Sequence, residues 1–200
     1  MDASTTMYTK WIKEKDVGSI LSCMSDRTLE KEKRIEALRA AIELTEEKEE
    51  TRKIQIAFLK HKVCALDTVV SFMREFPSDT DIYVKGAHVI RNICRVKDLW
   101  HESAKKNDVV SLLLKESTKL FVSSADAKEW TFRALINLNF SDDLESKMIE
   151  LKAAALAKVS LQSSKTQRDV VNAATFFVCN LSYAQNGCTH LLQEGILPSV

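Results

Sequence analysis

The chain reads Gly86-Ala-His-Val-Ile-Arg-Asn92-Ile93, an apolar helix face that ends in an asparagine, and this pattern occurs three times. The second copy is Thr131-Phe-Arg-Ala-Leu-Ile-Asn137-Leu138, and the third is Ala174-Thr-Phe-Phe-Val-Cys-Asn180-Leu181. Asn137 follows Asn92 by 45 residues, and Asn180 follows Asn137 by 43. A period of about 40–47 residues is typical of stacked helical repeats. We therefore expect an all-α solenoid whose function lies in a binding surface.

The composition agrees with a helical, intracellular protein. Only four Gly and two Pro occur among 200 residues, so there are few breakers for tight turns between strands. The net charge of +1 gives no argument for nucleic acid or a membrane surface. The N-terminus lacks a secretory signal, and no apolar run reaches the roughly 18 residues of a membrane span. Five cysteines without a CxxC motif indicate a reduced, cytoplasmic protein, and a nuclear location is also compatible.

The asparagine pattern divides the chain into repeats. We expect third helices at 82–96, 127–139 and 167–182, each the most apolar helix of its unit. The predicted organisation is N-terminal capping helices at 1–50, three repeats at 51–97, 98–140 and 141–182, and the start of a further repeat at 183–200. The last segment reads Gly195-Ile-Leu-Pro198, where Gly195 would end a helix in the left-handed conformation and Pro198 would open the next. Because the chain ends inside a unit, we expect it to be part of a longer protein.

Two segments carry further helix signals. Asp126 with Glu129, and Thr166 with Asp169, would each place a capping acceptor before a helix and an acid in its first turn. The segment 27–53 is dense in charge and has one apolar stripe, Ile35, Leu38 and Ile42. A coiled coil is a weaker interpretation, because the stripe stops after Thr45. We expect a capping helix with a solvated, self-paired surface.

This arrangement resembles the armadillo repeat family. The resemblance covers roughly 51–200 and is strongest at 172–200, where an Ala-rich helix ends in Asn180-Leu-Ser and is followed by a short helix and Gly195-Ile-Leu-Pro. HEAT repeats are the alternative, and the three-helix units with the Gly-Ile-Leu-Pro turn argue against them. The resemblance implies a right-handed superhelix of three-helix repeats with a concave groove lined by the third helices.

No catalytic, metal or cofactor motif stands out. The four glycines are isolated, so no phosphate-binding loop is expected, and the four histidines form no zinc-ligand set with the cysteines. His190, two residues from Cys188, is a weak hint only. We expect neither an enzyme nor a bound cofactor.

The resemblance gives the repeated asparagines a role, because armadillo proteins hold the main chain of an extended peptide with an asparagine ladder. An amide suits this role, since it both donates and accepts hydrogen bonds. Helix capping is the alternative. The residues one and two turns before each asparagine share its face. The candidate partner-binding residues are Asn92, Asn137, Asn180, Lys85, His88, Trp130, Arg133 and Phe176.

The neighbours of the asparagines bear on which partner is held. Importin-α-type repeats have a tryptophan four residues before the asparagine, whereas this chain has His88, Arg133 and Phe176 there. Nuclear-import cargo is therefore not the expected ligand. Basic residues on these helices are closer to catenin-like surfaces that bind acidic peptides; these residues are Lys85, Arg91, Arg95 and Arg133. Trp130 is either a core residue or a platform for the ligand.

The sequence thus predicts a non-catalytic scaffold or adaptor that binds a protein or peptide segment, acidic in character, along the groove. Two other classes stay open. One is a regulatory solenoid acting on another enzyme, such as a chaperone cofactor or a small-GTPase regulator. The other is the N-terminal interaction domain of a larger enzyme.

Overall fold

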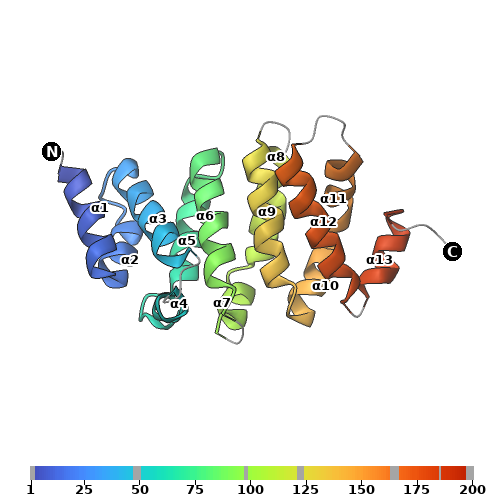
Figure 1. Ribbon diagram of the computed structural model, residues 1–200, viewed down its shortest axis with the longest axis horizontal. Helices are drawn as coiled ribbons and strands as arrows, with labels where there is room; N and C mark the ends of the chain where they lie inside the picture. Colours follow the sequence, from blue (N-terminus) through green and yellow to red (C-terminus); the bar gives the residue numbers. More distant parts are fainter. Residues whose placement is uncertain are drawn as a thin grey trace. The chain divides into compact units, whose positions relative to one another are not determined.

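The computed structural model describes residues 3–46, 51–96, 99–120, 124–162, 167–184 and 186–196, apart from the side chains of residues 3–6 and 116–117. These residues form α-helices and turns, and no strand occurs among them (Figure 1). The chain divides into two compact units, an N-terminal unit (Met1–Asn107) and a C-terminal unit (Asp108–Val200). The expected all-α fold is confirmed.

In the N-terminal unit, α3 is the central helix, and it packs against α1, α2, α4 and α6. α5 packs on α2 and α6, and α7 contacts α5. The helices are α1 (Ala3–Glu14), α2 (Val17–Ser25), α3 (Lys31–Thr45), α4 (Thr51–Lys60), α5 (Ala65–Glu75), α6 (Thr80–Ile93) and α7 (His101–Lys106).

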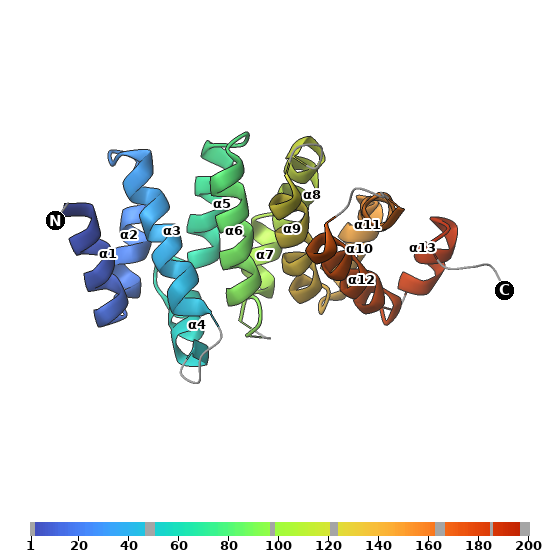
Figure 2. The same cartoon turned by 45° about the horizontal axis from the view of Figure 1, so that its top comes forward.

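In the C-terminal unit, α9 and α12 lie side by side in both views (Figures 1 and 2) and form its most extensive helix pair. α8 packs on α9, α11 on α12, and α13 on the end of α12. The helices are α8 (Val109–Leu120), α9 (Ala125–Leu138), α10 (Asp142–Glu150), α11 (Ala153–Gln162), α12 (Arg168–Ser182) and α13 (Gly187–Gln193). The expected third helices at 127–139 and 167–182 correspond to α9 and α12, and that at 82–96 corresponds to α6. The repeat boundaries themselves stay predictions.

The structure corrects one helix start. Ser124, and not Asp126, caps α9, because its side chain accepts a hydrogen bond from the Ala127 amide at 3.1 Å. Asp126 lies in the first turn, where a carboxylate still suits the helix dipole. Gln167 precedes α12 without a side-chain capping bond, and Thr166 lies outside the described residues.

The end of α13 follows the prediction. Gly195 has φ +64°, the left-handed conformation that lets a helix stop after its last turn. Lys158 Nζ donates to the Glu194 carbonyl at 2.6 Å and so ties this end to α11. Pro198 lies outside the described residues.

The charged segment 27–53 differs from the expected solvated helix. Neighbouring helices cover most of the circumference of α3. Eight of its residues are therefore buried: Arg34, Ile35, Ala37, Leu38, Ala40, Ala41, Leu44 and Thr45. Its alanines allow these helices to approach closely. α3 is therefore a core helix of the N-terminal unit, and its exposed residues are Glu32, Lys33 and Arg39.

A buried arginine ties α3 to α2 and α5. Arg34 is 3% exposed and donates to both carboxylate oxygens of Glu75, at 2.7 and 2.9 Å. Its Nε donates to the Met24 carbonyl at 2.9 Å, and its guanidinium lies 4.2 Å from the centroid of the Phe72 ring. The guanidinium is thus held by protein partners on its edges and on a ring face, as a buried charge requires.

The Arg34–Glu75 pair predicts a pH dependence. The hydrogen bond from Arg34 lowers the pKa of Glu75 below its ordinary 4.5. A carboxyl whose pKa falls on folding stabilises the folded state above its unfolded pKa, and this contribution is lost as the pH falls through the folded pKa. We expect the free energy of unfolding to decrease below about pH 4.5, and less steeply in Glu75→Gln. Urea unfolding at a series of pH values checks this, and identical pH slopes for the two proteins would contradict it.

Candidate functional site

α9 and α12 carry an aspartate and an asparagine at corresponding places, and each is followed by an exposed aromatic residue. Residues 43 apart in sequence take corresponding places on the two neighbouring helices. Because helical residues at spacings of three, four and seven share a face, each set forms one stripe. The corresponding pairs on the helices are Asp126 and Asp169, Arg133 and Phe176, and Asn137 and Asn180; Phe140 and Tyr183 follow just after the helix ends.

The two asparagines lie in the second half of each stripe. Both are half-buried, so their amides sit at the surface between neighbouring side chains. Asn180 Nδ2 donates to the Phe176 carbonyl at 2.9 Å, one turn back on the same helix. An amide offers two N–H donors and two acceptor lone pairs. This bond therefore orients the Asn180 amide and uses only one of its donors.

Arg133 is paired within α9. Its Nη2 lies 2.7 Å from Glu129 Oε1, and its guanidinium carbon lies 5.0 Å from the centroid of the Trp130 ring. Burial raises the pKa of Glu129, the nearby charge of Arg133 opposes this, and Asp169 and Asp126 add to the rise. The positive charge of Arg133 is therefore largely neutralised by carboxylates on the same face.

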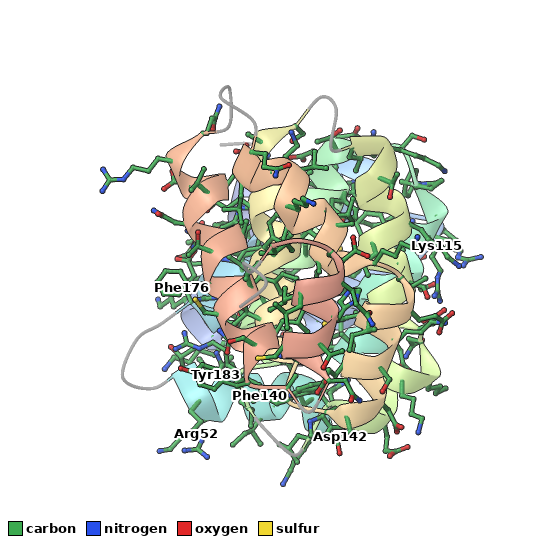
Figure 3. The ribbon with its side chains drawn as sticks, turned by 90° about the vertical axis from the view of Figure 1, so that its right-hand side faces the viewer. Arg52, Lys115, Phe140, Asp142, Phe176 and Tyr183 are labelled. Atoms are coloured by element: carbon green, nitrogen blue, oxygen red, sulfur yellow. The ribbon has the colours of Figure 1, made fainter. Side chains whose placement is uncertain are left out.

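The two aromatic candidates differ in exposure. Phe176 is 64% exposed (Figure 3), although the next residue along α12, Phe177, is fully buried. Trp130 is half-buried, with one side of its ring covered by Arg133. Trp130 is thus neither a core residue nor a bare platform.

The candidates Lys85 and His88 on α6 lie in the N-terminal unit and are largely engaged there. Lys85 forms an ion pair with Asp81 on its own helix and is 16% exposed. His88 Nε2 lies 3.6 Å from Glu46 Oε1, and its side chain is 13% exposed. These contacts leave both side chains little surface for a partner.

Asn92, the third candidate on α6, does not belong to an accessible site. It is fully buried, its Nδ2 donates to Thr45 Oγ1 at 3.1 Å, and its Oδ1 accepts from Arg91 Nη1 at 2.9 Å. The amide therefore joins α3 to α6 inside the N-terminal unit, and the expectation that Asn92 contacts a partner is wrong. The candidate site that remains is the α9–α12 face, defined by Glu129, Trp130, Arg133, Asn137, Phe176 and Asn180.

Solved structures with this arrangement of helices are repeat proteins. A designed armadillo repeat protein covers 94% of this chain and 74% of its own length, with a TM-score of 0.72 at 17% identity. Another, in complex with the peptide (KR)4, covers 96% of this chain and 75% of its own, with a TM-score of 0.74 at 18% identity. The chain has the armadillo-repeat fold.

A third structure similar to this chain is an engineered protein solved by structural genomics. It covers 90% of this chain and 68% of its own length, with a TM-score of 0.75 at 16% identity. No protein-family profile and no curated protein matches the sequence. At these identities the likeness establishes the fold, and the site must be argued from the residues of this chain.

Two exposed aromatic residues beside the α9–α12 face were not predicted from the sequence. Phe140 is 48% exposed and Tyr183 is 91% exposed, and each stands three residues after an asparagine of the stripe. Figure 3 shows them at the same end of the C-terminal unit. The 43-residue spacing was a signal for this pair, but their exposure is visible only in the structure.

A metal centre and a membrane span find no support in the part of the chain that the structure describes. It holds no group of three or more metal-ligating side chains. None of its helices combines the length and the apolar character needed to cross a membrane.

Proposed function

We propose that this chain is a non-catalytic interaction scaffold that binds an extended segment of a partner protein across the α9–α12 face. The observation that carries the proposal is a half-buried asparagine at the same place on each of two adjacent helices, Asn137 on α9 and Asn180 on α12. A surface that repeats along a line suits a ligand that also repeats, and an extended main chain presents an N–H and a C=O at every residue.

The dimensions agree with such a ligand. Packed helices lie about 8–10 Å apart, and an extended chain advances about 3.3 Å per residue. Asn137 and Asn180 would therefore meet main-chain groups two or three residues apart. Their amides would pair with both kinds of backbone group, while Phe176 and the Trp130–Arg133 pair would contact side chains.

The armadillo protein in complex with (KR)4 supports this mode, because that protein holds a peptide on the same fold. The basic residues that led us to expect an acidic partner are paired with carboxylates of this chain. Arg133 is paired with Glu129, and Lys85 is paired with Asp81. The charges of the α9–α12 face therefore do not favour a negatively charged segment.

The proposal is tested by removing both amides. A displayed library of random peptides would supply a ligand, whose affinity is then measured by fluorescence anisotropy. We expect Asn137→Ala combined with Asn180→Ala to weaken binding at least about tenfold, because two or more hydrogen bonds of about 1 kcal/mol each are lost. Gln162→Ala, which removes an exposed amide side chain from α11, is the matched control and should bind as the original chain does. Equal affinity of the double variant and the control would contradict the proposal.

A further inference from the structure

A cavity of about 450 Å³ lies at the surface of the N-terminal unit. Asp67, Ser71 and Arg74 line it from one face of α5, because residues three and four positions apart share a helix face. The lining is completed by Arg27, Glu75 and Asn107. Sites for small molecules commonly have a volume of about 300–1,000 Å³, so this cavity is large enough to hold one.

Two arginines line the cavity with hydrogen-bond donors. Arg74 Nη2 donates to the Asn107 carbonyl at 2.5 Å, and Arg27 Nε lies 3.5 Å from Glu75 Oε2. A guanidinium has five N–H donors. Within the described residues these contacts engage one donor of each arginine, so most of their N–H groups remain for a ligand.

The Glu75 carboxylate of the lining is already engaged by arginines. Its two oxygens accept hydrogen bonds from Arg34 at 2.7 and 2.9 Å, in addition to the contact with Arg27. Two positive charges therefore surround this one negative charge.

The Asp67 carboxylate is engaged by residues at the end of α7. Its Oδ1 accepts from Ser103 Oγ and from Asn107 Nδ2, both at 2.6 Å, and its Oδ2 accepts from Lys106 Nζ at 3.1 Å. Burial acts to raise the pKa of Asp67, but these three donors lower it overall. Asp67 is thus an ionised carboxylate whose oxygens already have partners.

The charge around the cavity is positive. In the described part of the N-terminal unit, its two carboxylates are met by four basic side chains, which are Arg27, Arg34, Arg74 and Lys106. Ser71 adds an exposed hydroxyl on α5. Guanidinium groups pair with phosphate oxygens in a bidentate geometry, and a serine hydroxyl can donate a further hydrogen bond.

We propose that this cavity binds a phosphate monoester, with donors from Arg27, Arg74 and Ser71 on the phosphate oxygens. A phosphate monoester presents three acceptor oxygens and a charge of about −1.5 to −2. Two guanidinium groups suit it better than they suit a carboxylate, which has two oxygens and a single charge. The volume of the cavity leaves room for the group that carries the phosphate. The site lies within the N-terminal unit and does not depend on the function proposed for the α9–α12 face.

The ligand class is tested with three probes: N-acetyl-phosphoserine amide, its unphosphorylated form and inorganic phosphate. Binding to the full chain is followed by nitrogen–proton NMR. We expect the phosphoserine derivative to bind at least about tenfold more tightly than the unphosphorylated form, because hydrogen bonds between charged groups are the stronger kind. Equal affinities of these two would overturn the site. Inorganic phosphate that binds as tightly as the phosphoserine derivative would overturn the monoester, since the rest of the cavity would then contribute nothing.

The donors are tested by Arg27→Gln combined with Arg74→Gln. We expect this double variant to lose at least about tenfold in affinity for the phosphoserine derivative, because both charged partners of the phosphate are removed. Arg74→Gln also removes the bond to the Asn107 carbonyl, so circular dichroism verifies that the fold is kept. A folded double variant with unchanged affinity would overturn the proposal.

Ser71→Asp is a second variant, and it leaves both arginines in place. Ser71 is exposed, so the substitution should preserve folding, and its carboxylate would repel the phosphate. We expect a loss of affinity of about tenfold. Ser146→Asp is the matched control, because Ser146 is exposed on α10 in the C-terminal unit and the change of charge is the same. Equal affinities of the Ser71→Asp and Ser146→Asp chains would contradict the placement of the phosphate beside Ser71.

Discussion

Replacing Phe177 with alanine is expected to lower the free energy of unfolding by about 4 kcal/mol, the typical cost of removing a fully buried phenylalanine. Phe177 is 0% exposed, and its ring is stacked on that of Phe132 with centroids 5.7 Å apart. This pair joins α12 to α9 beneath the α9–α12 face. The variant leaves a cavity between the two helices that position Asn137 and Asn180. Urea unfolding followed by circular dichroism measures the change.

The neighbouring Phe176 supplies the control for this prediction. It is 64% exposed, so Phe176→Ala should change the free energy of unfolding by less than about 0.5 kcal/mol. It should instead weaken peptide binding. A large loss of stability in Phe176→Ala, or none in Phe177→Ala, would mean that α12 presents a different face to α9.

Replacing Arg34 with alanine is expected to cost about 3 kcal/mol in the N-terminal unit, because removal of one partner from a buried ion pair leaves the other charge poorly compensated. Arg27, whose Nε lies 3.5 Å from Glu75 Oε2, remains beside the carboxylate. Here the variant leaves the Glu75 carboxylate and the Met24 carbonyl without this donor, and it uncovers the Phe72 ring. The side chain of Glu75 is 26% exposed, which keeps the cost near the lower end for such pairs.

Arg39→Ala is the matched control for Arg34, because Arg39 lies on the same helix with a 50% exposed side chain and pairs with Glu36. An exposed pair of this kind contributes at most about 1 kcal/mol. Equal effects of the two substitutions on urea unfolding would show that the buried guanidinium is not what ties α3 to α5.

The sequence predicted the helices that matter most. A spacing of 45 and 43 residues located α6, α9 and α12, because the period of a stacked repeat is imposed by the packing of one unit on the next. The left-handed Gly195 was also readable, since few other residues adopt that conformation. A helix end such as this one depends on residues that are close together in the sequence, so the sequence predicts it.

The burial and the hydrogen-bond partners of each asparagine could not be predicted from the sequence. Asn92 has the same sequence context as Asn137 and Asn180, yet it is buried and bonded to Thr45, which lies 47 residues away. The burial of α3 was missed for the same reason, because its covering helices come from several distant segments. Burial depends on the neighbours of a helix, which its own periodicity does not specify.

The pairing of charges in the candidate site could be predicted in part from the sequence. Glu129 precedes Arg133 by four residues on one helix, a spacing at which opposite charges pair. Counting the basic residues of the third helices without their carboxylate partners led to the expectation of an acidic ligand. The structure places such partners beside Arg133 and Lys85.

The central claim is that the Asn137 and Asn180 amides hold the main chain of a bound segment. The most direct measurement follows the side-chain amide resonances of the asparagines by nitrogen–proton NMR while a peptide selected from the displayed library is added. The account predicts that the signals of Asn137 and Asn180 shift with peptide concentration, whereas that of the buried Asn92 stays in place. Saturable binding of the peptide without a shift of the Asn137 and Asn180 signals would contradict it.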